Sequence, residues 1–129
     1  MAEPVWLDAE LILALYPNIV EVSGGAVGVR DEGLLRSALA RAENRHAYEG
    51  VEDLAELAAT YAVAVAKNHP FIDGNKRAAF LCLGLFLSDN GWELTAEPLD
   101  AAEVILKVAA GETGIEQLAV WVREHSRPS

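Results

Sequence analysis

Five side chains that can do chemistry are crowded into one short stretch of the chain. They are His69, Asp73, Asn75, Lys76 and Arg77. Lys76 and Arg77 stand side by side where an apolar helix is predicted to begin, and the helix dipole already makes that end positive. Free backbone N–H groups at a helix N-terminus bind anions. We therefore predict a phosphate-binding site, and two cations suit a ligand with more than one phosphate group.

The neighbouring residues supply the other parts of a phosphate-transfer site. Gly74 lets the backbone approach a ligand closely, and the amide of Asn75 can orient a ligand or an attacking group. The carboxylate of Asp73, beside phosphates, is a natural Mg²⁺ ligand; the alternative is that Asp73 only caps the helix. His69 can act as a general base toward a hydroxyl.

Other kinds of active site fit the sequence less well. A zinc site would have His69 and Asp73 as two ligands, and no nearby His or Cys supplies a third. A Ser-His-Asp hydrolase is disfavoured because no serine lies in a nucleophile elbow. The glycine-rich stretch 23–28 lacks the lysine of a P-loop, so we interpret it as a flexible connection. His46 and His125 have no neighbours of this chemical kind.

Two buried helices are predicted to flank the loop. Apolar residues recur with helical spacing over residues 51–68, and Pro70 disfavours helical geometry at His69, which ends that helix. The next helix, residues 75–88, is apolar on every face. Between them, Phe71 is expected to anchor the loop in the core.

The first third of the chain predicts two more helices. Asp8 can cap a helix that is expected to stop before Pro17. Asp31 can cap the next helix, whose leucines and alanines recur with helical spacing. The polar residues 41–50 are expected to be less regular.

The last third predicts a short extended piece and two further helices. Residues 92–95 alternate between polar and apolar, and Pro98 opens a helix that closes near Gly111. Thr113 and Glu116 have the spacing of a capping box for the last helix. The sum is a single all-α domain over residues 1–129, with about six helices.

Composition narrows the function. The chain of 129 residues is 52% apolar and 23% charged, which suits one folded domain, and its net charge of −10 argues against broad nucleic-acid binding. Its longest apolar run, residues 78–87, is shorter than the roughly 20 residues that span a bilayer. The first ten residues lack the basic segment of a signal peptide, and the single Cys82 is expected to be buried. We expect a cytoplasmic protein with neither a membrane nor a nucleic-acid partner.

The stretch His69-Pro-Phe-Ile-Asp-Gly-Asn-Lys-Arg77 resembles the signature of the Fic/Doc family, HxFx(D/E)(G/A)N(G/K)R, at seven defined positions of nine. It is most similar to the Doc (death-on-curing) branch, because Lys76 stands where Fic enzymes have a second glycine and the chain is short. Residues 24–50 are also similar to the segment that follows the first helix of Doc-like proteins. The resemblance covers about residues 6–125 and implies a compact helical Fic/Doc-like domain.

The resemblance also implies roles for the residues. Fic enzymes transfer AMP from ATP to a target hydroxyl, whereas Doc toxins bind the nucleotide in the reverse sense and transfer its γ-phosphoryl group to a threonine of elongation factor Tu. On this basis His69 is the general base and Asp73 the Mg²⁺ ligand. The expected catalytic residues are His69, Asp73, Asn75 and Arg77. The expected phosphate-binding residues are Gly74, Asn75, Lys76, Arg77 and Lys67.

Two departures from the Fic pattern favour phosphoryl transfer. Phe80 stands where Fic enzymes have a second arginine, so adenylylation in the usual orientation loses a phosphate contact. Lys76 replaces a glycine and crowds the anion nest.

The chain also lacks the (S/T)xxxE(G/N) inhibitory sequence of many Fic proteins, so control is expected to come from a separate chain. In Doc systems this is a small antitoxin that folds on binding and lays a helix in a groove.

The leading hypothesis is therefore a toxin of a toxin–antitoxin pair. It would use ATP and Mg²⁺ to phosphorylate a Thr or Ser hydroxyl of a translation protein such as elongation factor Tu. The alternatives are an adenylyltransferase on the same scaffold and a degenerate family member that acts only as a binding module. The motif disfavours the latter, which has no need to keep His, Asp, Asn and Arg together. Because chain and target are both acidic, recognition is expected to be local, through Arg41, Arg45 and Lys67.

Overall fold

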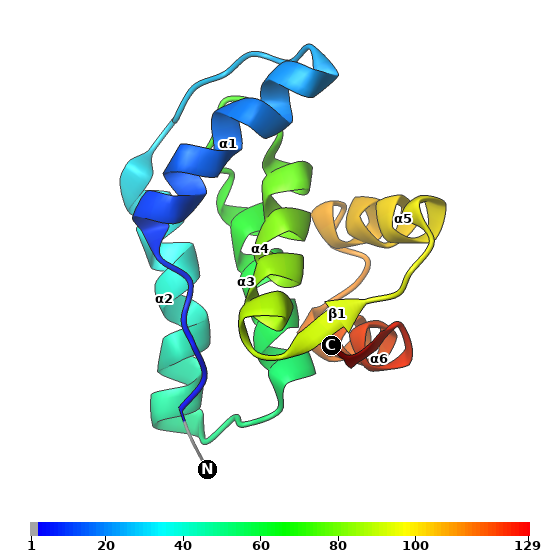
Figure 1. The fold of residues 1–129 in the computed structure, drawn as a ribbon. Coiled ribbons are helices and arrows are strands. Elements are labelled where there is room, and N and C mark those ends of the chain that lie inside the picture. The colour runs from blue at the N-terminus through cyan, green and yellow to red at the C-terminus, as the bar shows by residue number, and fades with distance from the viewer. Residues whose placement is uncertain (1–2) are drawn as a thin grey trace.

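The structure, a computed structural model, describes residues 3–129, apart from the side chains of residues 22 and 23. Its elements in chain order are α1 (Ala9–Ser23), α2 (Glu32–Glu49), α3 (Leu54–Asn68), α4 (Asn75–Asp89), β1 (Trp92–Leu94), α5 (Pro98–Ala109), α6 (Ile115–Glu124) and β2 (Ser126–Pro128) (Figure 1). The prediction of an all-α fold with about six helices is confirmed. Residues 1 and 2 of the predicted domain lie outside the described part of the chain.

Helix α3 is the centre of the core. Eleven of its 15 residues are buried, and six of these are alanine, so neighbouring helices can approach it closely. It packs against α2, α4, α5 and α6. Figure 1 shows α1 and α2 on one side of the α3–α4 pair, with α5, α6 and the strands on the other. The motif loop, residues 69–74, joins the two central helices as predicted.

The first helix continues past the proline at which it was expected to stop. Asp8 caps α1 by accepting a hydrogen bond from the Glu10 N–H, but Pro17 lies inside the helix. A proline inside a helix costs about 3 kcal/mol. Ile12, Tyr16 and Val20, all fully or almost fully buried, lie on one face of α1 and flank the proline. Burying each such side chain contributes about 1.5–3 kcal/mol, so their packing outweighs the lost hydrogen bond.

Two other local predictions were wrong in detail. The polar stretch 41–50 is helical almost to its end, because α2 continues to Glu49 and closes at Gly50 in the left-handed conformation. The predicted capping box of Thr113 and Glu116 does not form, because the N-cap of α6 is Gly114, which has no side chain. There the Gly114 N–H donates to Oε1 of Gln117 at 3.0 Å.

The strands β1 and β2 form a short antiparallel pair, with Trp92 opposite Pro128. The extended piece predicted over residues 92–95 is thereby confirmed. β1 precedes α5 in the chain, and β2 follows α6. No helix within residues 3–129 is long and apolar enough to cross a membrane.

Candidate active site

His69 ends α3 in a left-handed backbone conformation. Its φ is 49° and its ψ is 56°, and its N–H donates to the Val65 carbonyl at 3.2 Å. Within the described residues it is the one non-glycine residue with positive φ. This conformation costs an ordinary residue about 1–2 kcal/mol. Such strained positions cluster at functional sites, where the surrounding structure holds them in place.

Arg30, in the segment before α2, holds the end of α3. Its Nε donates to the His69 carbonyl at 2.8 Å and its Nη2 to the Asn68 carbonyl at 2.9 Å. Its backbone N–H donates to the Pro70 carbonyl at 2.8 Å. A cation at a helix C-terminus is also favoured by the dipole. Arg30 therefore satisfies the carbonyls at the point where the motif loop begins.

Tyr16 of α1 holds the other end of the motif loop. Its hydroxyl donates to the Asp73 carbonyl at 2.7 Å, and its ring stacks on Phe71 with ring centroids 3.8 Å apart. Phe71 is 1% exposed, which confirms its predicted role as an anchor in the core. The Ile72 N–H donates to the Gly28 carbonyl at 2.9 Å, so the glycine-rich segment also packs along the loop.

Sequence analysis missed both Tyr16 and Arg30. The spacing of Tyr16 with Ile12 and Val20 was a usable signal, because a tyrosine on a buried helical face needs a partner for its hydroxyl. Arg30 carries no local signal, since its partners are carbonyl groups 38 and 39 residues away in the sequence.

The side chain of Asn75 braces the loop. Its Oδ1 accepts from the Phe71 N–H at 3.0 Å and its Nδ2 donates to the Phe71 carbonyl at 2.9 Å. The amide that was expected to orient a ligand is thus largely occupied within the protein. What Asn75 leaves available to a ligand is its backbone N–H and one amide hydrogen.

The N-terminus of α4 has the charge and the open backbone that an anion site needs. In the described part of the chain the other five helices carry an acid in the first turn, but α4 carries Lys76 and Arg77. Both cations are exposed, and neither has an ion-pair or hydrogen-bond partner among the described residues. Gly74 precedes them with φ 78°, and a Cβ there would lie 2.7 Å from Cγ2 of Val20. Only glycine fits this close turn, which leaves the first N–H groups of α4 open.

Asp73 presents an exposed carboxylate beside this N-terminus. Its Oδ1 accepts from the Gly74 N–H at 2.8 Å, and a Cβ on Gly25 would lie 2.5 Å from its Oδ2. It does not cap the helix, because the N-cap residue is Gly74 and no side chain makes a cap hydrogen bond there. The described residues contain no cluster of three or more metal-ligating His, Cys, Asp or Glu. One carboxylate fits Mg²⁺ when phosphate oxygens and water complete its shell.

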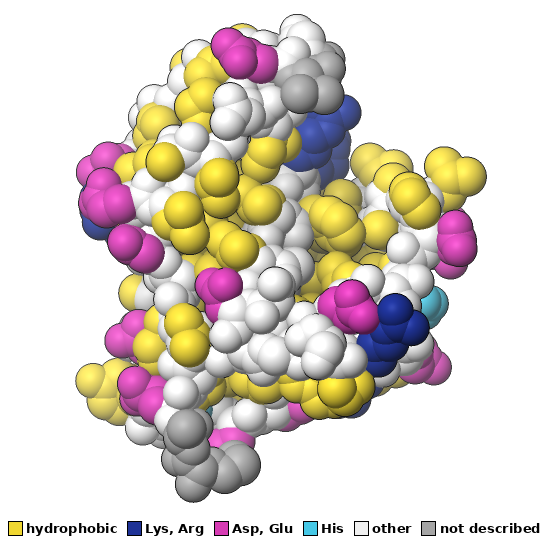
Figure 2. All heavy atoms as spheres, viewed as in Figure 1, with side chains coloured by type: hydrophobic (Ala, Val, Ile, Leu, Met, Phe, Trp, Pro, Cys, Tyr) yellow, Lys and Arg dark blue, Asp and Glu magenta, His cyan; other side chains and the backbone are white. Residues whose placement is uncertain are grey.

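These residues face one groove of about 1430 Å³, called here the motif groove. The expected site residues that line it are His69, Asp73, Gly74, Asn75, Lys76 and Arg77. Phe80, Ile105 and Leu106 supply apolar lining from α4 and α5, and Ile72 lies at its edge, 60% exposed. Figure 2 shows hydrophobic side chains in the hollow between α4 and α5, with Lys and Arg atoms at its upper end. The structure does not bring Lys67 into this groove.

Similarity to known proteins identifies the family of the chain. A model of the Fic/DOC family matches residues 6–87, which include the whole motif loop and the first turn of α4. The chain belongs to the Fic/Doc family. Within the Fic/Doc family it resembles the protein kinase Doc of Escherichia phage P1, with 35% identity over 117 residues, 91% of this chain and 92% of the relative. It is also 35% identical to the toxin Doc of Mycolicibacterium smegmatis over 99 residues, 74% of this chain and 76% of the relative. The predicted placement in the Doc branch is confirmed.

Proposed function

We propose that the chain is a toxin that transfers the γ-phosphoryl group of ATP to a Thr or Ser hydroxyl of a translation protein, such as elongation factor Tu. The observation that carries this proposal is that a potential base, His69, lines the same groove as the open, doubly cationic N-terminus of α4. The names of the two relatives, a protein kinase and a toxin, point the same way.

In the proposed reaction His69 accepts the proton of the target hydroxyl, and the hydroxyl oxygen attacks the γ-phosphorus. The bond from that phosphorus to the bridging oxygen breaks, and ADP leaves with the electron pair. Lys76, Arg77 and the N–H groups of α4 hold the phosphates and neutralise their charge. Asp73 would hold a Mg²⁺ ion together with phosphate oxygens, and that ion would supply further charge neutralisation.

Phe80 supports phosphoryl transfer over adenylyl transfer. It lies one turn after the two cations and lines the groove with an apolar, half-buried ring. No Lys or Arg follows Arg77 in α4, so this helix offers no further cation to a nucleotide whose phosphates lie along it. The cations are confined to the first turn, which suits a reacting phosphate at the mouth of the groove beside His69.

The apolar part of the motif groove supports a helical antitoxin as the controlling partner. Leu106 is 55% exposed on the α5 wall, opposite Phe80 and Leu81 of α4. Grooves of this kind receive the apolar face of an amphipathic helix. Because ATP would bind in the same groove, such a helix would exclude it. The whole reaction is proposed for the cytoplasm, with neither a membrane nor a nucleic acid as partner.

The chemistry can be tested with purified protein, Mg²⁺ and a translation extract. ATP is labelled on the γ-phosphate in one reaction and on the α-phosphate in another. His69→Asn is the control, since asparagine tolerates the left-handed backbone. We expect one protein to take up label from the γ-phosphate only, and not with the variant. Label from the α-phosphate would mean adenylylation, and no label in either reaction would contradict enzymatic activity on the translation machinery.

The antitoxin groove can be tested in cells whose growth is arrested by the chain and rescued by an antitoxin. Leu106→Asp should escape rescue, because it puts a charge on the groove wall. Leu99→Asp is the matched control: Leu99 is also on α5 and is 85% exposed, but it does not line the groove. Rescue of both variants would show that the antitoxin binds elsewhere.

A further inference from the structure

Within the described part of the chain, the Lys and Arg side chains without a partner lie in two places. The chain has 10 Lys and Arg against 20 Asp and Glu. Five of the cations form ion pairs, and Arg30 binds loop carbonyls. The four with no partner among the described residues are Arg41, Lys67, Lys76 and Arg77. Two of these line the motif groove, and the other two line a second groove.

The second groove has a volume of about 860 Å³ and runs over α3 between α2 and the first turn of α6. Its floor is apolar, formed by the buried residues Val63 and Ala64. Its α2 wall presents Arg41 and Asn44, and its α6 wall presents Gln117. Three cations and two carboxylates line it, the reverse of the balance in the whole chain. It is therefore a locally basic channel on an acidic protein.

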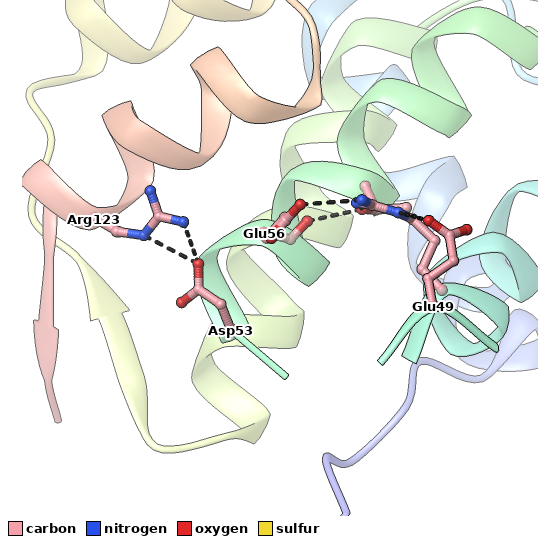
Figure 3. A network of polar contacts seen from close by, with 6 residues as sticks. Glu49, Asp53, Glu56 and Arg123 are labelled. Carbon is pink, nitrogen blue, oxygen red and sulfur yellow. Dashed lines mark hydrogen bonds and ion pairs between the residues drawn. The ribbon is translucent and has the colours of Figure 1, made fainter. Parts of the chain in front are cut away.

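Arg45 belongs to the wall and is not free for a partner. Its guanidinium binds Glu56 at 3.0 Å, Oγ1 of Thr60 at 2.8 Å and Glu49 at 3.5 Å. Figure 3 shows Glu49 and Glu56, the two carboxylates of this network. The earlier expectation that Arg45 contacts a target is thus corrected: it ties α2 to α3, and the free charge of the groove comes from Arg41 and Lys67.

The second groove leads to the proposed base. Lys67 and Asn68 line it, and the next residue, His69, lines the motif groove. Lys67 projects from the last turn of α3, whereas the left-handed backbone of His69 turns the chain out of the helix toward the motif groove. A segment lying along the second groove would reach the C-terminal end of α3, where His69 is exposed.

We propose that the second groove docks an acidic segment of the protein substrate and so presents a neighbouring hydroxyl to His69. This inference rests on the proposed function. Arg41 and Lys67 would pair with carboxylates, and the amides of Asn44 and Gln117 would bind the backbone of an extended peptide. No aromatic residue lines the groove, so it lacks the stacking surface that single-stranded nucleic acids use.

The test uses two synthetic peptides, one with a threonine beside a run of glutamates and one with glutamines in their place. Binding to the full chain is followed by backbone amide shifts in NMR and by fluorescence anisotropy. We expect the acidic peptide to shift the amides of residues 37–45, 63–68 and 114–117. Arg41→Glu with Lys67→Glu should weaken its binding about tenfold or more. Lys107→Glu with Arg127→Glu, the same total charge change at two exposed sites outside both grooves, should leave it unchanged.

Other outcomes overturn the inference. Shifts confined to residues 74–77 would place the peptide on the phosphate site, and equal binding of the neutral peptide would remove the role of charge. No binding, or tighter binding of a single-stranded RNA oligonucleotide, would also refute it. These measurements need no phosphate transfer, so they are separate from the labelling experiment. A labelled protein with no peptide binding would leave the kinase intact and reject the docking groove.

Discussion

His69 meets two demands that differ in kind. Its backbone must turn left-handed to end α3, and its side chain is proposed to take a proton. Glycine and asparagine meet the first demand at least as well as histidine, but neither can meet the second. Function and stability can therefore be separated at this one position.

Replacing His69 by Asn or Gly should abolish phosphoryl transfer without unfolding the protein. We expect the rate to fall by about 10²–10⁴, the usual contribution of a general base. The free energy of unfolding should stay the same or, for glycine, rise by up to about 1 kcal/mol as backbone strain is relieved. Urea unfolding and γ-phosphate labelling measure the two effects. A large loss of stability would mean that the imidazole supports the fold.

Alanine variants of Gly74 and Gly91 can be compared to measure the cost of a close contact at the start of α4. Both have positive φ, 78° and 85°, but only Gly74 has a neighbour in the way, Cγ2 of Val20. Gly91→Ala should cost about 1 kcal/mol for its backbone alone. Gly74→Ala should cost about 1–3 kcal/mol more and weaken binding of inorganic phosphate. Equal unfolding free energies for the two variants would show that the turn can relax away from Val20.

At the scale of elements, the motif loop is held from outside its own helices. α1 reaches it through Tyr16, and the segment before α2 reaches it through Arg30. The two flanking helices define where the loop begins and ends, and the contacts of Tyr16 and Arg30 hold its backbone in place between them. Since the proposed base and the proposed phosphate site lie at its two ends, loss of a holding contact should affect the proposed chemistry as well as stability.

Tyr16→Phe keeps the ring stacked on Phe71 and removes only the hydroxyl. It leaves the Asp73 carbonyl without that partner, so we expect a loss of about 1–2 kcal/mol in stability and a lower kcat. Tyr48→Phe is the control, because Tyr48 is 85% exposed on α2. Circular dichroism during urea unfolding and the labelling rate report the two effects. Identical behaviour of the two variants would contradict the role given to Tyr16.

Local signals predicted the helices and the residues of the loop, but not the contacts between remote segments. Asp8 and Asp31 cap their helices as expected, since a cap depends on residues two or three positions away. The prediction that α1 stops before Pro17 was wrong because the tertiary packing of α1 outweighs the cost of a proline inside a helix. The Tyr16–Asp73 contact spans 57 residues, and no periodicity encodes it. Lys67 lies in another groove because it projects from the last turn of α3, whereas His69 follows the helix with left-handed backbone.

At the scale of the whole molecule, two buried ionisable groups limit stability in alkali. Burial raises the pKa of Tyr61 from 10.0 to about 12 and that of Cys82 from 9.0 to about 12. The folded state thus disfavours their ionised forms. Their contribution to stability is complete below pH 9.0 and is lost as the pH rises toward 12.

We expect the free energy of unfolding to fall above pH 9.0, by up to about 1.4 kcal/mol per pH unit for each group. Cys82→Ala should flatten this fall, even though the smaller side chain lowers stability at neutral pH. Urea unfolding as a function of pH, for both proteins, measures the difference in slope. The same slope in both would assign the alkaline loss to other groups.

The cationic start of α4 has a further consequence for the molecule as a whole. Without an anion, Lys76 and Arg77 are repelled by each other and by the positive end of the helix dipole. This repulsion destabilises the ligand-free folded state. Any anion that binds only the folded state shifts the folding equilibrium by mass action, by about 2.7 kcal/mol at one hundred times its dissociation constant. The melting temperature should therefore be higher in phosphate than in chloride of equal ionic strength. With the proposed nucleotide as ligand, cellular ATP would stabilise the folded chain, so the share of the chain that survives proteolysis would follow the ATP concentration of its host.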